Sequence, residues 1–327
     1  MTQAFDEELR SLLADDRVLA EEPLARHTTF RIGGPAEWLV LPESEDEVRA
    51  VVEACRRRGV PWRVLGLGSN VLAADAGVRG VVIKLADGFS RIDVGAGGER
   101  GAGGAANEAA VDVRDGATDA VVLTAQAGAT NEAVAEAACA AGLAGYEFAS
   151  GIPGTIGGAA VMNAGAYDGE FKDVAVGVRC LTPEGEVFEV PAAEAAWGYR
   201  ASLMMERGYV VLGATLRLRP DDPAAIRARM DDLRRRREDK QPLEMPSAGS
   251  TFKRPEGYYA GKLIQDAGMQ GRSVGGAQVS TKHAGFVVNA GDATAADVLG
   301  LIELVQSQVK SKFGVDLEPE VRLWGVN

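Results

Sequence analysis

A short glycine-rich segment, Gly66-Leu67-Gly68-Ser69-Asn70, follows a run at Trp62–Leu65 that is typical of a β-strand. Glycines allow backbone N–H groups to converge on an anion without interference from Cβ atoms, and serine and asparagine add side-chain donors. A pyrophosphate group would suit this loop. Its spacing is not the G-x-G-x-x-G of Rossmann domains, and no clear amphipathic helix follows it, so a Rossmann site is not expected. A simple turn without a ligand is the alternative interpretation.

A second and longer cluster of small residues lies further along the chain. It comprises Ser150-Gly151-Ile152-Pro153-Gly154-Thr155-Ile156-Gly157-Gly158-Ala159, followed by Asn163-Ala164-Gly165-Ala166-Tyr167. So many small residues allow a flat ligand and the backbone to approach closely. Two such loops suggest one large ligand held between two subdomains.

The motifs that contain these loops carry a family resemblance. RVLGLGSNVLAAD (63–75) and SGIPGTIGGAAVMNAGAYDGE (150–170) resemble the two FAD-binding segments of the vanillyl-alcohol-oxidase/PCMH-like flavoproteins. Together with four further motifs they closely resemble the UDP-N-acetylenolpyruvoylglucosamine reductase (MurB) family. These are HTTFRIGGPAEW (27–38), GYRASL (198–203), PSAGSTFKRP (246–255) and LEPEVR (317–322). The motifs follow the family's order.

The resemblance implies an NADPH-dependent enzyme that reduces UDP-N-acetylglucosamine enolpyruvate to UDP-N-acetylmuramate in peptidoglycan precursor synthesis. Hydride passes from NADPH through noncovalent FAD to C3, charge builds on the substrate carboxylate, and C2 takes a proton. This chemistry requires a cation, an acid near the carboxylate and a proton donor. By resemblance Ser250 is the donor, while Arg200 and Glu320 stabilise the enolate. Glu320 must then be protonated or share a proton, which requires a raised pKa; Glu318 is the competing carboxylate.

The resemblance also implies the ligand contacts. Cofactor binding is expected from both loops: Gly66, Leu67, Gly68, Ser69, Asn70, Gly151, Ile152, Pro153, Gly154, Thr155, Gly157 and Gly158. Substrate contacts are expected from Tyr167, Lys240, Arg254, Lys282 and His283. Some relatives carry asparagine where this chain has Arg254, and a structural role is an equal alternative for His283. Only residues 201–249 separate Arg200 from Ser250, as in the shorter, second type of the family, which lacks an inserted tyrosine-bearing loop.

Two other functions compete with the reductase. One is an FAD-dependent alcohol oxidase of the same fold, many of which attach the flavin through His or Cys. Neither glycine-rich loop contains these residues, which favours the reductase. The other is a non-catalytic nucleotide-sugar binding protein, which the complete set of Arg200, Ser250 and Glu320 argues against.

The order of the helices and strands expected along the chain, together with the family resemblance, predicts an α+β, three-domain flavoprotein. We expect FAD-binding subdomain 1 at 1–85, FAD-binding subdomain 2 at 86–220, a smaller α+β substrate domain at 221–316, and a C-terminal segment at 317–327 that returns to the active site. The last is expected to be extended.

Sequence patterns predict several individual elements. Ser44 and Glu47 form a capping box before a helix with one apolar face. Thr130 should cap a helix at 131–141, and apolar residues of 295–313 should line one face of a long helix. Strands are expected at 61–65, 81–85, 119–129, 186–190, 209–218, 273–279 and 285–289. A charged helix at 224–239 should expose its run of four arginines, and the glycine-rich stretch 95–104 reads as an exposed loop.

Composition restricts the remaining classes. The net charge is −12, which argues against general binding to nucleic acid or anionic membranes. With 46% hydrophobic and 25% charged residues the chain is typical of a globular protein, and no apolar stretch is long enough to span a bilayer. Cys55, Cys139 and Cys180 form no C-x-x-C, and there are only two histidines, so no metal site is expected. We expect buried, reduced thiols, a cytoplasmic location and no obligate protein partner.

Overall fold

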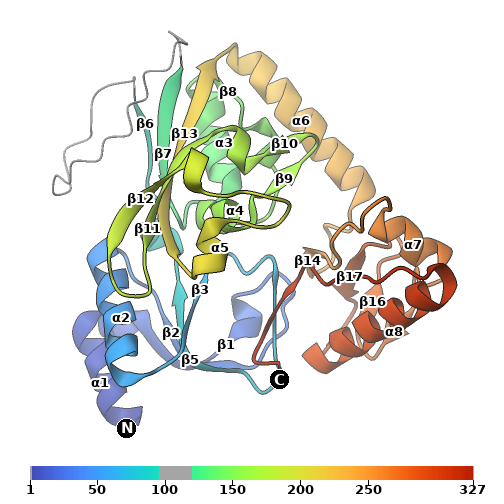
Figure 1. Cartoon of the computed structure of the whole chain (residues 1–327), viewed down its shortest axis with the longest axis horizontal. Helices are drawn as coiled ribbons and strands as arrows, with labels where there is room; N and C mark the ends of the chain where they lie inside the picture. Colours follow the sequence, from blue (N-terminus) through green and yellow to red (C-terminus); the bar gives the residue numbers. More distant parts are fainter. Residues whose placement is uncertain (1, 96–119, 327) are drawn as a thin grey trace. The chain divides into compact units, whose positions relative to one another are not determined.

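The computed structural model describes residues 2–95 and 120–326 (Figure 1). Contacts divide the chain into two units, each drawn from three stretches. Unit 1 comprises Met1–Val18, Val40–Gly66 and Ile83–Arg235, and unit 2 comprises Leu19–Leu39, Leu67–Val82 and Arg236–Asn327. This division by contacts differs from the four functional segments expected from the sequence, whose roles stay a prediction. Apart from Gly95, the glycine-rich stretch 95–104 lies outside the described residues.

Unit 1 is built on an antiparallel sheet. Its strand order is β12 (Val187–Pro191), β11 (Ala175–Leu181), β13 (Val210–Pro220), β7 (Val121–Gln126) and β6 (Ile92–Gly95), and β8 (Leu143–Ala144) also pairs with β13. Strand β13 is the centre of the sheet in Figure 1. Its first five residues are buried, which explains the nearly continuous apolar run there. The strands predicted at 119–129, 186–190 and 209–218 are confirmed.

The helices of unit 1 include the one after Ser44, whose apolar face is buried as the sequence predicts. They are α1 (Thr2–Leu12), α2 (Glu45–Arg58), α3 (Asn131–Ala140), α4 (Ile156–Met162), α5 (Leu203–Arg207) and the part of α6 (Pro223–Lys240) up to Arg235. The Ser44 hydroxyl caps α2 by accepting from Glu47 N–H. The second half of the predicted box is wrong, because the Glu47 carboxylate accepts from Glu43 N–H and pairs with Arg17 instead.

The remaining short elements of unit 1 lie close to the predicted site segments. Strand β3 (Trp62–Leu65) precedes Gly66, and β9 (Gly165–Ala166) pairs with β10 (Gly169–Glu170). Helix α4 packs on β13 and on α5. The second glycine-rich cluster therefore leads into a helix that rests on the central strand of the sheet.

Unit 2 contains several small sheets. Strands β1 (Val18–Pro23), β2 (Pro35–Val40) and β5 (Val78–Lys84) are neighbours in that order, and β4 (Val71–Ala73) pairs in parallel with β18 (Arg322–Trp324). A separate antiparallel sheet has the order β14 (Ser247–Ser250), β17 (Phe286–Asn289), β16 (Ala277–Val279) and β15 (Ser273–Val274). The helices are α7 (Ala260–Asp266) and α8 (Ala295–Phe313).

The core of unit 2 forms around α8. The predicted apolar face is buried, and it packs with α7 and the strands β15 and β16. The single strand predicted at 273–279 is wrong. A turn at Gly275 and Gly276 divides it into β15 and β16, since Gly275 has φ +52° and a Cβ on Gly276 would lie 2.1 Å from the Gly291 carbonyl oxygen.

The structure also bears on the expectations for the cysteines and for the arginine run. All three cysteines are free and buried, as predicted, and burial raises the pKa of the Cys55 and Cys180 thiols to about 12. The arginine run is not wholly solvated, because Arg237 is only 2% exposed.

Within 2–95 and 120–326, no helix is long and apolar enough to cross a bilayer. In the same residues, no cluster of three Asp, Glu, His or Cys side chains could hold a metal ion.

Candidate active site

Three motif segments meet in unit 2 around Glu320, the second glutamate of the LEPEVR motif. Its backbone N–H donates to the Thr251 carbonyl at 2.8 Å, directly after Ser250. Its carbonyl accepts from the Asn70 side-chain amide at 3.2 Å, and Arg322 N–H donates to the Asn70 carbonyl at 2.9 Å. Two main-chain bonds and one side-chain bond thus bring the segment of Ser250, the segment of Glu320 and one end of the first glycine-rich loop together.

The two carboxylates of the LEPEVR motif have different surroundings. The Glu318 side chain is 70% exposed and pairs with Lys253 at the surface. Glu320 is only partly exposed and lies beside the segments of Ser250 and Asn70. The lower exposure of Glu320 favours it over Glu318 as the acid, and this assignment stays a prediction.

The first glycine-rich loop is shaped by close packing of the main chain. Gly68 has φ +70°, and a Cβ there would lie 2.3 Å from the His27 carbonyl oxygen. The Gly68 carbonyl accepts from Thr29 N–H at 3.3 Å, and the Thr29 hydroxyl donates to the Ser247 carbonyl at 2.6 Å. The HTTF motif therefore supports both the loop and strand β14. The His27 ring lies 3.0 Å from the Glu22 carboxylate, which is consistent with a structural role.

The second glycine-rich loop is held by the first turn of α3. Asn131 is 1% exposed, its N–H donates to the Gly154 carbonyl at 3.0 Å, and its side-chain amide donates to the Ile152 carbonyl at 3.3 Å. The buried Tyr146 hydroxyl donates to the Asn131 side-chain oxygen at 2.9 Å, which turns the amide nitrogen toward the loop. The loop is thus fixed by side chains.

The two loops touch within unit 1 and leave an open side. A Cβ on Gly66 would lie 2.4 Å from the Thr155 hydroxyl, so the loops pack there at glycine distance. Thr155 caps α4 by accepting from Gly158 N–H, and Gly157 packs on Ala127. A Cβ on Gly158 would meet only the Thr155 hydroxyl, at 3.9 Å. Small residues that leave one face of the loop open fit a flat cofactor such as a flavin.

Arg200 lies at the tip of a tight turn in unit 1. Gly198 N–H donates to the Ala201 carbonyl at 3.1 Å, and Arg200 has φ +54°, a conformation that non-glycine residues seldom adopt. Both flanks of the turn are anchored on α4, because Trp197 Nε1 donates to the Ala160 carbonyl at 2.8 Å and the Ser202 hydroxyl to the Val161 carbonyl at 2.7 Å. Both bonds go to carbonyls in the last turn of α4, where the helix itself offers few N–H partners.

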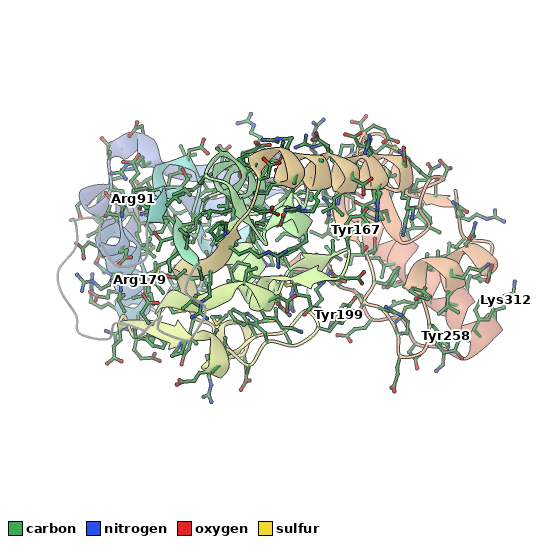
Figure 2. All side chains as sticks on the ribbon, turned by 90° about the horizontal axis from the view of Figure 1, so that it is seen from above. Arg91, Tyr167, Arg179, Tyr199, Tyr258 and Lys312 are labelled. Carbon is green, nitrogen blue, oxygen red and sulfur yellow. The ribbon has the colours of Figure 1, made fainter. Side chains whose placement is uncertain are left out.

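Arg200 and Tyr167 line the same polar cavity of about 420 Å³. Figure 2 labels Tyr167 and Tyr199 of this lining. The other residues are Gly165, Ala166, Asp168, Gly169, Glu170, Lys172, Asp173 and Arg200. The hydrogen bond from Lys172, with smaller contributions that include the charge of Arg200, holds the pKa of Glu170 below its usual value, so the cavity contains an ionised carboxylate between two cations.

Asn163 connects the parts of this cavity. It is 1% exposed and has φ +43°. Its side-chain nitrogen donates to Glu170 at 3.0 Å and to the Gly198 carbonyl at 3.2 Å, and its oxygen accepts from Lys172 N–H at 3.0 Å. One amide therefore fixes the β9–β10 segment against the turn that carries Arg200.

The other predicted substrate residues lie in unit 2. Lys282 Nζ donates to the Glu238 carbonyl at 2.5 Å, which brings it to the end of α6, close in sequence to the exposed Lys240. The Arg254 guanidinium lies 4.2 Å from the centre of the Tyr259 ring. His283 Nδ1 accepts from Gly285 N–H at 3.1 Å, and burial lowers the pKa of His283, so its ring is neutral near pH 7.

Sequence reasoning missed three residues of this site: Asn131, Glu132 and Asn163. Asn131 and Glu132 occupy the first turn of α3, where polar residues are common on any helix. Asn163 stood within the second cluster without a role. The feature that identifies such residues is a buried polar side chain beside a ligand-binding loop. Burial cannot be seen in the sequence and becomes visible only in the fold.

Comparisons with known proteins decide the family. Residues 36–191 match an FAD binding domain, and residues 241–324 match the C-terminal domain of UDP-N-acetylenolpyruvoylglucosamine reductase. The chain is 49% identical to the UDP-N-acetylenolpyruvoylglucosamine reductase of Agathobacter rectalis over 99% of both chains. The chain belongs to the UDP-N-acetylenolpyruvoylglucosamine reductase family. It is also 44% identical to that reductase of Clostridioides difficile, over 97% of this chain and 96% of the relative.

A solved structure of the reductase family supports the fold. The UDP-N-acetylenolpyruvylglucosamine reductase (MurB) of Thermus caldophilus superposes with a TM-score of 0.73 at 33% identity, covering 94% of this chain and 98% of that one. The predicted α+β flavoprotein fold is therefore confirmed, and so is the flavin class of the cofactor.

Proposed function

We propose that this chain catalyses the NADPH-dependent, FAD-mediated reduction of UDP-N-acetylglucosamine enolpyruvate to UDP-N-acetylmuramate, a step of peptidoglycan precursor synthesis. Full-length similarity to reductases of this name and the FAD-binding domain support it. The observation that carries the proposal is that hydrogen bonds in unit 2 join Glu320 to Thr251, the neighbour of Ser250, and to the Asn70 side chain. The alcohol oxidase and the non-catalytic binding protein have no comparable support.

The roles of the residues follow from the chemistry of an enolpyruvyl ether. Bound FAD supplies the hydride relay between NADPH and the substrate. Ser250 is exposed, so its hydroxyl is available to protonate C2 of the enol. Arg200 presents a planar cation to the substrate carboxylate, and Glu320 donates a hydrogen bond to the enolate when it carries a proton.

The glycine-rich loops are the proposed flavin site. Gly66–Asn70 would hold the pyrophosphate, and the loop 150–158 would face the flat parts of the cofactor. Tyr167, Lys240, Arg254 and Lys282 are the proposed contacts of the sugar nucleotide. The Nδ1 and ring contacts of His283 support a packing role for this residue as well.

We also place the reaction in the cytoplasm, where NADPH is available. Three buried thiols that form no disulfide are compatible with a reducing compartment.

One experiment tests the function directly. The absorbance spectrum of the purified chain should show bound flavin. NADPH should bleach it, and UDP-N-acetylglucosamine enolpyruvate should restore the colour of the oxidised flavin. A colourless protein that cannot be reconstituted with FAD would contradict both flavoenzyme interpretations. Flavin that NADPH reduces but that the enolpyruvyl substrate does not reoxidise would contradict the reductase alone.

A further inference from the structure

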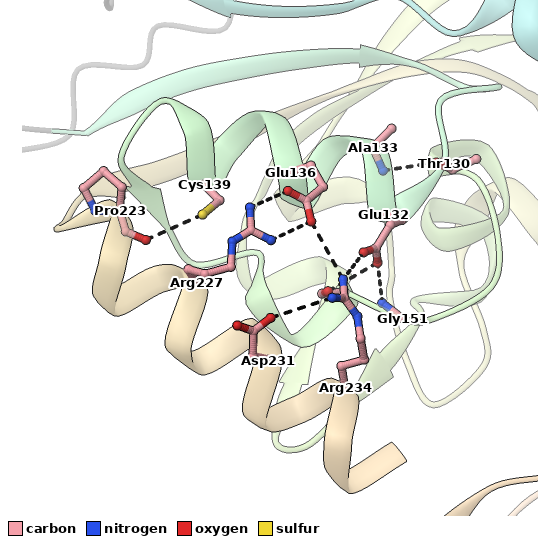
Figure 3. A network of polar contacts seen from close by, with 11 residues as sticks. Thr130, Glu132, Ala133, Glu136, Cys139, Gly151, Pro223, Arg227, Asp231 and Arg234 are labelled. Carbon is pink, nitrogen blue, oxygen red and sulfur yellow. Dashed lines mark hydrogen bonds and ion pairs between the residues drawn. The ribbon is translucent and has the colours of Figure 1, made fainter. Parts of the chain in front are cut away.

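The carboxylate of Glu132, the second residue of α3, contacts the second glycine-rich loop directly (Figure 3). Its Oε2 accepts from Gly151 N–H at 2.7 Å and from the Ser150 hydroxyl at 3.3 Å. Ser150 is completely buried, and Gly151 has φ +76°. The carboxylate therefore satisfies two donors at the point where the loop adopts a conformation that favours glycine.

The other oxygen of Glu132 is bound to a different element. Oε1 accepts from Arg234 Nη2 on helix α6. The Arg234 guanidinium also lies 3.8 Å from Glu136 and 3.7 Å from Asp231. Because each oxygen of Glu132 has its own partner, the guanidinium fixes the plane of the carboxylate and directs Oε2 to the loop.

We propose that Glu132 is a positioning residue for the flavin-binding loop and that Arg234 sets its orientation. This inference rests on the proposed assignment of the loop 150–158 to the flavin. A hydrogen bond to an ionised acceptor is stronger than one between neutral groups. Without it, the Gly151 N–H loses its acceptor and the Ser150 hydroxyl loses one of its contacts, so the loop relaxes. Cofactor binding must then restore the loop conformation, which lowers the affinity for FAD.

The same two helices contain a matched control. Arg227 of α6 binds Glu136 of α3 through two hydrogen bonds of 2.7 and 2.5 Å. Glu136 lies one helical turn after Glu132, and its side chain is exposed to the same extent, 41%. Among the contacts of the described residues, neither Arg227 nor Glu136 reaches the loop 150–158. Removing this pair weakens the packing of α3 on α6 without touching the loop.

The test is a titration of FAD into the flavin-free full-length chain, with the dissociation constant and the melting temperature measured for each variant. Glu132→Ala should raise the dissociation constant by about tenfold or more, whereas Glu136→Ala should change it by less than about threefold. Both should lower the melting temperature, because Glu132→Ala loses the pair with Arg234, and Glu136→Ala loses the pair with Arg227 and the longer contact with Arg234. Glu132→Gln keeps an acceptor for Gly151 and should recover most of the affinity. Arg234→Gln should weaken FAD binding to an intermediate degree.

Two results would overturn the inference. One is an equal loss of FAD affinity in Glu132→Ala and Glu136→Ala, which would mean that any loss of packing between the helices weakens binding. The other is a wild-type dissociation constant in both the folded Glu132→Ala variant and the folded Arg234→Gln variant. A wild-type chain that binds no FAD would instead refute the proposed function, so the two failures are distinguishable.

Discussion

The two units hold their proposed site residues with different kinds of bond. In unit 2, main-chain hydrogen bonds join Glu320 to Thr251 and Arg322 to Asn70. In unit 1, side chains hold the loop 150–158 and the turn of Arg200. A main-chain hydrogen bond survives most substitutions unless the new Cβ overlaps a neighbouring atom. A side-chain hydrogen bond is lost as soon as that one residue is replaced. We therefore expect the site of unit 2 to be sensitive at its glycines and that of unit 1 at its buried polar residues.

The largest effect is expected from Gly68→Val. The new Cβ would overlap the His27 carbonyl oxygen, and φ at this position is +70°. Strain and overlap together should cost at least about 3 kcal/mol and remove bound flavin. Thermal unfolding and the flavin content of the purified protein measure both effects. Gly257→Val is the matched control, because Gly257 also has a positive φ, +75°, but nothing within 4 Å. Equal stability and full flavin in both variants would contradict the packing argument.

The second largest effect is expected from Ser250→Ala, which distinguishes a role in proton transfer from a role in stability. Ser250→Ala removes one exposed hydroxyl and no main-chain bond, so stability and flavin reduction by NADPH should stay near wild type. Reoxidation of the flavin by the enolpyruvyl substrate should slow by roughly 10²–10⁴-fold, the usual loss for a general acid. Stopped-flow measurement of the two half-reactions checks this, with Ser247→Ala on the same strand as the control.

The Ser250→Cys variant tests the same assignment further, since a thiol can also donate a proton. Ser250→Cys should retain more activity than Ser250→Ala. If Ser250→Ala slowed only the NADPH half-reaction, Ser250 would not be the proton donor.

A smaller effect is expected from Asn163→Ala in unit 1. It removes three hydrogen bonds of a buried side chain and should cost about 2–3 kcal/mol in urea unfolding. The turn of Arg200 loses one anchor, so the KM for the enolpyruvyl substrate should rise. Asn163→Gly accommodates φ +43° without the amide. A wild-type KM in Asn163→Gly would show that backbone conformation, and not the side-chain bonds, positions Arg200.

The smallest effect concerns Glu136→Gln and pH. The hydrogen bond from Arg227 lowers the pKa of Glu136 in the folded chain below its ordinary value of 4.5. The pair therefore stabilises the fold fully above that ordinary pKa, and its contribution is lost as pH falls through the lower, folded-state pKa. The melting temperature of wild type should exceed that of Glu136→Gln slightly at pH 7, and the difference should disappear on acidification. A difference that is constant with pH would mean that packing, and not charge, is responsible.

Local patterns predicted much of the fold because their causes are local. The caps at Ser44 and Thr130 and the apolar face of α8 depend on residues a few positions apart. The division of 273–279 into two strands could not be predicted this way, since the Gly276 turn is imposed by the distant Gly291 carbonyl.

The candidate site shows the same limit. Motifs that resemble those of the reductase family indicated the glycine-rich loops, Arg200, Ser250 and Glu320. The residues that hold them act across long sequence separations, as with Glu132 and Arg234, which are 102 positions apart. In the sequence Glu132 is an ordinary acidic residue in the first turn of a helix, and only its contact with Gly151 distinguishes it.

The parallel pairing of β18 with β4 also determines when the site can form during synthesis. Asn70 and its partner Glu320 are 250 positions apart, so β4 leaves the ribosome long before β18 exists. At about 5–20 residues per second, the first loop waits roughly 12 to 50 seconds for the strand that completes it. A nascent chain interrupted before residue 320 would lack Glu320 and the strand partner of β4, so assembly of this part of the site requires that translation has passed β18.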